Sequence, residues 1–108
     1  MKQGVYGCGV EVSLDVLGGK WKTVILAQLK QGPMRYADLR RALPRLSDKV
    51  LTERLRELET SELIVRSPRA SGGGYALSAR GESLRPVLDA LYAWGEVHAL
   101  ELGATIRR

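Results

Sequence analysis

The sequence is poor in cysteine and in long apolar runs. Its single cysteine, Cys8, excludes an intrachain disulfide and fits a reducing compartment. The longest clearly apolar run, residues 24–27, is far too short to span a bilayer. The N-terminus has no apolar signal region, so we expect a cytoplasmic protein without a membrane partner.

Linkers, internal repeats and low-complexity segments are also absent, which indicates one domain over residues 1–108. The lone histidine, His98, and the lone cysteine are too few for a tetrahedral zinc site without carboxylates or a second subunit. No spacing of serine, histidine and aspartate suggests an activated nucleophile. We therefore expect no metal, no other cofactor and no enzymatic activity.

Positive charge is concentrated in the middle third of the chain. Residues 20–56 hold ten lysines and arginines against Asp38, Asp48 and Glu53, a balance of +7, and the remainder sums to −2. Such clustering is typical of a protein that binds a polyanion. The alternative is a solvated basic face without a partner, and charge alone does not decide between them.

The spacing of apolar residues predicts a mainly α protein with a small β-hairpin. Helices are expected at residues 10–17, 21–30, 36–43 and 47–60, and extended runs at 63–67 and 75–77. Ser78 caps a long last helix that Pro86 should kink. Segments 8–19 and 78–102 carry apolar stripes that we expect to pack against a second copy of the chain. The candidate interface residues are Leu14, Leu84, Leu88, Leu91 and Trp94.

Residues 34–60 have the pattern of a helix-turn-helix with a turn at Pro44. Ser47 is a suitable N-cap for the second helix, and Asp48 in the first turn complements the helix dipole. At about 100° per residue, one face of this helix is apolar and consists of Leu51, Leu55 and Leu58. The opposite face is polar and partly basic and consists of Lys49, Thr52, Glu53 and Arg56.

A helix pair with a basic second member is how a small protein places side chains in a DNA major groove, so double-stranded DNA is the expected partner. Ser47 and the helix N-terminus could hold a phosphate. Glu53 could accept a hydrogen bond from a cytosine amino group, or form an ion pair with Lys49 or Arg56.

Three further arginines are candidates for contact with the DNA backbone. Arg35 stands at the start of the helix-turn-helix, and Arg54 lies toward the core-facing edge of the second helix. Arg69 lies at the tip of the hairpin formed by residues 63–77. Guanidinium groups are common phosphate ligands.

Four landmarks in order resemble the HxlR-type winged helix-turn-helix transcription regulators, which are distant relatives of MarR-type regulators. After Cys8, the landmarks are LDVLGGKW at residues 14–21, GPMRYADL at 32–39, LSDKVLTERLRELE at 46–59, and YALSARGESLRPVL at 75–88 with Trp94-Gly95. The resemblance covers residues 8–98. It implies a winged helix-turn-helix with extra N- and C-terminal dimerisation helices.

The resemblance also implies a homodimer on a near-palindromic operator, with the Ser47 helix in the major groove and the hairpin tip against the flanking backbone. Three positions depart from the family pattern. The hairpin tip is short and glycine-rich, Gly9 replaces the usual proline after the cysteine, and Glu62 replaces the usual glycine after the second helix. A left-handed cap on a non-glycine residue costs roughly 1–2 kcal/mol, so we expect a different turn at Glu62.

Cys8 is the candidate chemical switch, because some members of this family sense oxidants or electrophiles through a cysteine at this position. Sensing there joins subunits by a disulfide or forms an adduct. A nearby helix N-terminus favours a reactive thiol, whereas Glu11 and Asp15 oppose it. The alternative is a small buried hydrophobe at the dimer interface. Likewise, Trp21, Tyr36, Tyr92 and Trp94 could line a small-molecule pocket, but such residues are more often part of the core.

The leading hypothesis is a sequence-specific, homodimeric transcription regulator, with an oxidant or small molecule as its candidate signal. A non-specific architectural DNA-binding protein is the alternative, with steep salt dependence and no sequence preference. A winged-helix module that binds only proteins is disfavoured by the basic clustering. A thiol-dependent peroxide scavenger is the least favoured, because no resolving cysteine or base is evident.

Overall fold

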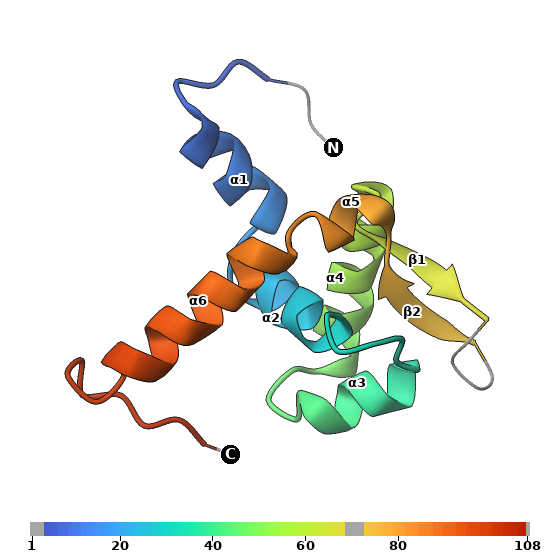
Figure 1. The fold of residues 1–108 in the computed structure, drawn as a ribbon. Helices are drawn as coiled ribbons and strands as arrows, with labels where there is room; N and C mark the ends of the chain where they lie inside the picture. The colour runs from blue at the N-terminus through green and yellow to red at the C-terminus, as the bar shows by residue number, and fades with distance from the viewer. Residues whose placement is uncertain (1–3, 69–72, 108) are drawn as a thin grey trace.

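The structure is a computed structural model that describes residues 4–68 and 73–107. In this part of the chain, four helices precede a two-stranded antiparallel hairpin and two helices follow it (Figure 1). The elements are α1 (Gly9–Leu17), α2 (Lys20–Leu29), α3 (Tyr36–Ala42), α4 (Asp48–Thr60), β1 (Ile64–Ser67), β2 (Gly74–Leu77), α5 (Ala79–Glu82) and α6 (Arg85–His98). This is the predicted mainly α arrangement with a small β-hairpin.

The core lies where α2, α3 and α4 meet the hairpin. Helix α4 contributes its predicted apolar face, and α2 contributes Ile25, Leu26 and Leu29. The core side chains with at most 2 % exposure are Ile25, Leu26, Leu29, Leu39, Leu51, Leu55, Leu58, Leu63, Ile64 and Leu88. Burying leucine and isoleucine contributes roughly 1.5–3 kcal/mol per side chain, so these contacts fix α4 against the rest of the domain.

Helix α4 begins and ends as predicted, but the turn that follows it differs from the prediction. The Ser47 hydroxyl accepts a hydrogen bond from the Val50 N–H at 3.2 Å, which confirms the N-cap. Glu62 nevertheless keeps the left-handed conformation, with φ 62°, that was expected to be avoided. The turn holds because the Leu63 N–H donates to the Leu58 carbonyl at 3.0 Å and the Ser78 hydroxyl donates to the Glu62 carbonyl at 2.6 Å.

The hairpin pairs β1 with β2 from Ile64 opposite Leu77 to Ser67 opposite Gly74. It is tied to the α2–α3 connection by two hydrogen bonds between Met34 and Tyr75, at 3.0 and 2.9 Å. These bonds fix the hairpin beside the helix-turn-helix. The predicted tip contact, Arg69, lies outside the described residues.

The segment after the hairpin contains two helices where the sequence predicts one kinked helix. The helix is interrupted between α5 and α6. Pro86 lies in the first turn of α6, where its missing N–H costs no helical hydrogen bond. Gly81 in α5 allows a close approach, since a Cβ there would lie 2.1 Å from the Leu63 carbonyl oxygen. Any larger residue would push α5 away from the hairpin.

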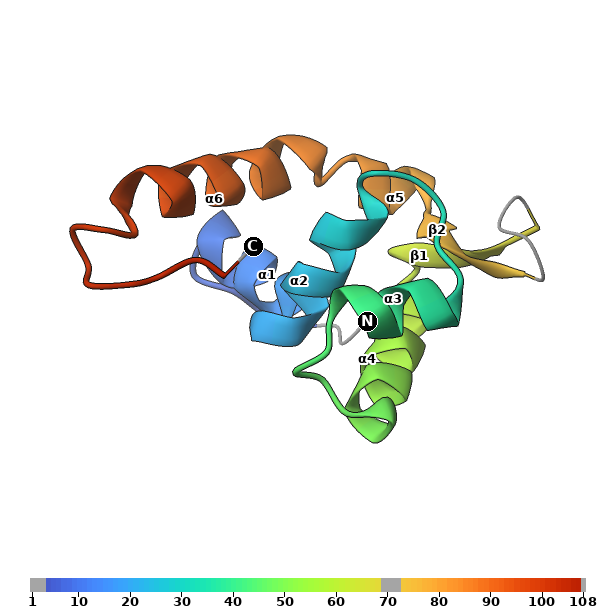
Figure 2. The same cartoon turned by 90° about the horizontal axis from the view of Figure 1, so that it is seen from below.

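Helix α6 is anchored to the core by its first half only. Leu88 is buried, the Asp89 carboxylate pairs with Lys30 Nζ at 2.6 Å, and Arg85 Nη1 donates to the Lys30 carbonyl at 2.9 Å. Figures 1 and 2 show that α1 and the far end of α6 both lie on the side of the molecule away from the hairpin, and Figure 1 shows them diverging from each other. None of the helices in the described residues is both long enough and apolar enough to cross a membrane.

Candidate nucleic-acid interface

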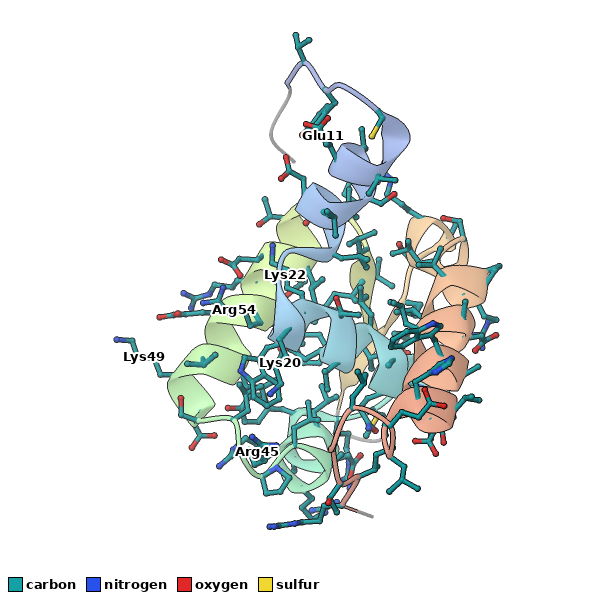
Figure 3. The ribbon with its side chains drawn as sticks, turned by 90° about the vertical axis from the view of Figure 1, so that its left-hand side faces the viewer. Glu11, Lys20, Lys22, Arg45, Lys49 and Arg54 are labelled. Atoms are coloured by element: carbon teal, nitrogen blue, oxygen red, sulfur yellow. The ribbon has the colours of Figure 1, made fainter. Side chains whose placement is uncertain are left out.

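The outer face of α4 is exposed, as the helical spacing predicts. Lys49, Thr52 and Arg56 are exposed on the side opposite the buried leucines of this helix. Figure 3 shows Lys49 pointing away from the body of the protein. Lys49 and Arg56 make no hydrogen bond or ion pair with any other residue in the described ranges. Both cations are therefore free to bind an anion.

Glu53 and Arg54 are paired with each other instead of facing outward as independent groups. Arg54 lies between two carboxylates, with Nη2 at 3.2 Å from Glu53 Oε2 and Nη1 at 2.7 Å from Glu57 Oε1. The predicted ion pair of Glu53 with Lys49 or Arg56 is wrong, because Arg54 takes this carboxylate. Arg54 would have to leave these partners to bind a phosphate.

Arg35 stands at the N-cap of α3 and carries a charge that is only partly balanced. Its backbone N–H and Nε both donate to Asp38 Oδ2, at 3.2 and 3.4 Å. The Arg35 side chain, followed by its backbone N–H, holds the pKa of the Asp38 carboxyl below its usual range. Arg41 pairs with the same carboxylate. Two guanidinium groups on one carboxylate leave net positive charge at the start of the helix-turn-helix.

A polar network that the sequence analysis missed fixes the turn between α3 and α4. Tyr36 Oη donates to Asp48 Oδ1 at 2.7 Å, and Arg40 Nε donates to the same oxygen at 2.8 Å. Arg40 Nη1 also donates to the Leu46 carbonyl at 2.6 Å, inside the turn. The Tyr36 hydroxyl first, and then the charge of Arg40, hold the pKa of Asp48 below its usual range. The network orients the first turn of α4.

Little in the residue spacing indicates this network. Arg40 and Asp48 are eight residues apart and flank Pro44, so no helical repeat relates them. Tyr36 was considered only as core or as the lining of a ligand pocket. It does line a cleft of about 500 Å³ between α3 and the hairpin, together with Tyr75. Trp21, Tyr92 and Trp94 line neither this cleft nor the second one beside the hairpin.

The candidate dimer residues fall into two groups. Leu14, Leu91 and Trp94 are exposed, at 64 %, 49 % and 59 %. Leu88 is only 2 % exposed and belongs to the core of a single chain, so its assignment to a dimer interface is wrong. Leu84 is half-buried against the same core. The helical stripe of α6 alone could not tell the chain's own core from the surface of a second chain.

Cys8 is exposed and directly precedes α1. The two carboxylates that were expected to oppose a reactive thiol are engaged nearby: Tyr6 Oη donates to Asp15 Oδ2 at 2.6 Å, and the Gly7 N–H donates to Glu11 Oε2 at 2.9 Å. One chain alone does not bury the thiol, so the alternative of a small hydrophobe at the dimer interface would need a second copy to cover it. Among the described residues, no three metal-ligating side chains gather into a site.

A family model described as HxlR-like helix-turn-helix matches residues 16–102. The chain belongs to this family. The HTH-type transcriptional regulator YtcD of Bacillus subtilis is 42 % identical over 104 residues, which cover 91 % of this chain and 80 % of YtcD. These findings confirm the resemblance to HxlR-type regulators.

Solved structures of similar proteins share the fold. The redox regulator HypR in its oxidised form has a TM-score of 0.74 and 34 % identity, covering 83 % of this chain and 96 % of HypR. Quinone-bound YodB from Bacillus subtilis has a TM-score of 0.68 and 32 % identity, covering 81 % of this chain and 94 % of YodB. The predicted winged helix-turn-helix is thus confirmed. The chain is a transcriptional regulator with a helix-turn-helix DNA-binding fold, and such regulators are generally not enzymes.

Proposed function

We propose that this HxlR-like protein is a homodimer that reads a near-palindromic DNA operator through the outer face of α4. The observation that carries the proposal is the pair of free cations, Lys49 and Arg56, beside Thr52 on a helix fixed to the core. Two copies of α4 would enter successive major grooves, about 34 Å apart. Binding then blocks or repositions RNA polymerase at a promoter.

The side chains around α4 have two proposed roles: some hold the DNA backbone in place, and others contact the base edges. Arg35 and Ser47 stand at helix N-termini, where backbone N–H groups and positive charge favour phosphate. Lys49, Thr52 and Arg56 face the base edges. Glu53 and Arg54 form an ion pair on this face of α4. This ion pair must break before either side chain can contact DNA directly.

Replacing Arg56 by alanine tests the reading role. If Arg56 reads a base, the variant loses about 1–3 kcal/mol of binding free energy on the operator and less on random DNA. The measurement is fluorescence anisotropy with an operator selected from a random library, against excess random competitor. Arg80→Ala is the matched control, because Arg80 lies in α5, away from the outer face of α4, and its charge is paired with Glu62.

Equal losses on operator and random DNA would assign Arg56 to phosphate. Wild-type binding that random competitor erases would contradict sequence-specific reading. It would favour the architectural alternative, in which the same basic face coats DNA without preference.

The dimer rests on the exposed apolar surface of α1 and α6. Leu14, Leu91 and Trp94 lie at the end of the molecule where these helices project. A surface of this kind on a small domain marks a protein interaction site. Pairing through α1, near the N-terminus, and α6, near the C-terminus, leaves both copies of α4 free for DNA.

Cys8 carries the proposed signal. The thiols of two copies would lose two electrons and two protons to a hydroperoxide, which becomes an alcohol and water, and a disulfide would join the subunits. The exposure of Cys8 supports this role, as does the likeness to HypR, which is described as a redox regulator. A quinone adduct on the same sulfur is the second route, supported by the likeness to quinone-bound YodB.

The variant Cys8→Ser separates DNA binding from sensing. We expect its operator affinity in reductant to equal that of the wild type, and its response to added peroxide or quinone to be lost. Anisotropy before and after oxidant treatment measures both quantities. An oxidant response that survives in Cys8→Ser would remove Cys8 from the mechanism.

A further inference from the structure

A second cluster of cations lies beside α4, on the side away from the hairpin. We call Lys20 and Lys22 of α2, with Arg45 of the turn before α4, the basic flank. Figure 3 shows these three residues and Lys49 on the same side of the molecule, with Glu11 far from them on α1. Lys49 thus belongs both to the outer face of α4 and to the edge of the basic flank.

The charges of the basic flank are not neutralised. Lys22 and Arg45 make no hydrogen bond or ion pair with any other residue in ranges 4–68 and 73–107. Lys20 Nζ lies 4.7 Å from the centroid of the Trp21 ring, a contact that holds the side chain without removing its charge.

The nearby carboxylates of α4 do not compensate these cations either. Asp48 is taken by Arg40, with 2.8 Å between Arg40 Nε and Asp48 Oδ1. Glu53 and Glu57 share Arg54, which leaves one negative charge on α4 against the three positive charges of the basic flank. The basic flank therefore presents net positive charge to solvent.

We propose that the basic flank binds the sugar–phosphate backbone of DNA beside the groove that α4 enters. This inference rests on the function proposed above and extends its footprint. Figures 1 and 2 place the start of α2 and the hairpin on opposite sides of α4. The basic flank thus adds a backbone contact on the side of the reading helix that faces away from the hairpin.

The chemistry favours phosphates over other anions. Duplex DNA carries one negative charge per about 1.7 Å of its axis, so several flexible cations on one face find phosphates without special geometry. Arg45 lies three residues before α4, so DNA bound by α4 lies close to this part of the basic flank.

The test measures the salt dependence of DNA binding by Lys22→Gln and Arg45→Gln. Each variant should reduce the slope of log K against log salt concentration by about 0.9, the value for one lost phosphate contact. Affinity at ~0.1 M salt should fall about five- to tenfold, equally on operator and random DNA. Lys22→Arg, which keeps the charge, should restore the slope.

Arg80→Gln is the matched control, because Arg80 lies in α5, outside the basic flank, with its charge paired to Glu62. It changes the net charge by the same amount and should leave the slope at the wild-type value. Equal slopes for Lys22→Gln, Arg45→Gln and the wild type would overturn the inference. So would a loss of dimerisation in sedimentation that accounts for the whole change in affinity.

Failure of the proposed function has a different signature. In that case the wild-type protein itself binds neither operator nor random DNA. A wild type that binds, together with unchanged slopes in both variants, rejects the basic flank alone.

Discussion

Glu62 occupies a backbone conformation that side chains other than glycine rarely adopt. Its φ is 62°, directly after α4 and before the buried Leu63. The left-handed region costs a non-glycine residue roughly 1–2 kcal/mol, and the hydrogen bond from Ser78 to the Glu62 carbonyl helps to hold it there. The turn is required by the fold, whatever residue stands at this position.

The substitution Glu62→Gly should therefore raise the free energy of unfolding by about 1 kcal/mol, since glycine adopts this conformation without the steric cost. The lost ion pair with Arg80 is exposed and subtracts only a few tenths. Urea unfolding measures the difference. Thr60→Gly, two residues earlier and inside α4, is the control and should lower stability by up to about 1 kcal/mol. Equal destabilisation by both substitutions would contradict the argument.

Residue by residue, the sequence predicted what depends on spacing within one helix. The cap at Ser47 and the exposure of Lys49 follow from such spacing, and both are found. The sequence-based prediction failed where residues that are distant in the sequence determine whether a side chain is buried. Leu88 has the same pattern as Leu91, yet only Leu88 meets the core.

Helices α3 and α4 act as one unit because Asp48 connects them. This carboxylate starts α4 and accepts hydrogen bonds from Tyr36 and Arg40 of α3. The sequence predicted both helices and the turn between them. It could not predict the network, since the path of the turn through Pro44 decides which side chains meet.

The acid dependence of stability tests this connection. The folded pKa of Asp48 lies below the ordinary value of about 3.9, so the carboxylate stabilises the fold above that pH and its contribution is lost as the pH falls through the folded pKa. Wild type should exceed Asp48→Asn in unfolding free energy at pH 7, and the difference should shrink below about pH 4. Urea unfolding of both proteins at pH 7 and pH 3 measures it. A difference that is the same at both pH values would remove Asp48 from the network.

For the whole molecule, the fold class and the family could be predicted because four local landmarks occur in a fixed order. The hairpin and the positive charge of the middle third followed from composition and turn residues. The break between α5 and α6 did not, since the bare Gly81 against the Leu63 carbonyl becomes visible only when α5 is packed on the hairpin.

The double variant Leu91→Ala/Trp94→Ala tests the proposed dimer. Both side chains are about half exposed in one chain, so their truncation should leave the helical content unchanged. Dimer dissociation should become at least about tenfold easier, because central aromatic residues dominate interfaces. Sedimentation across a concentration series measures it. Val65→Ala is the control, an exposed apolar residue of β1 that should have no effect. An unchanged dimer in the double variant would place the interface elsewhere.

Helix α6 faces the core with Leu88 and solvent with Leu91 and Trp94. One residue inserted between Leu88 and Leu91 would turn everything beyond it by about 100° around the helix axis and leave α4 intact. In the proposed dimer, the two reading helices would then meet DNA at a different separation. In this dimer, the register of α6 sets the spacing between the two half-sites, and α4 determines which bases are bound. Regulators built this way can change operator spacing and operator sequence independently.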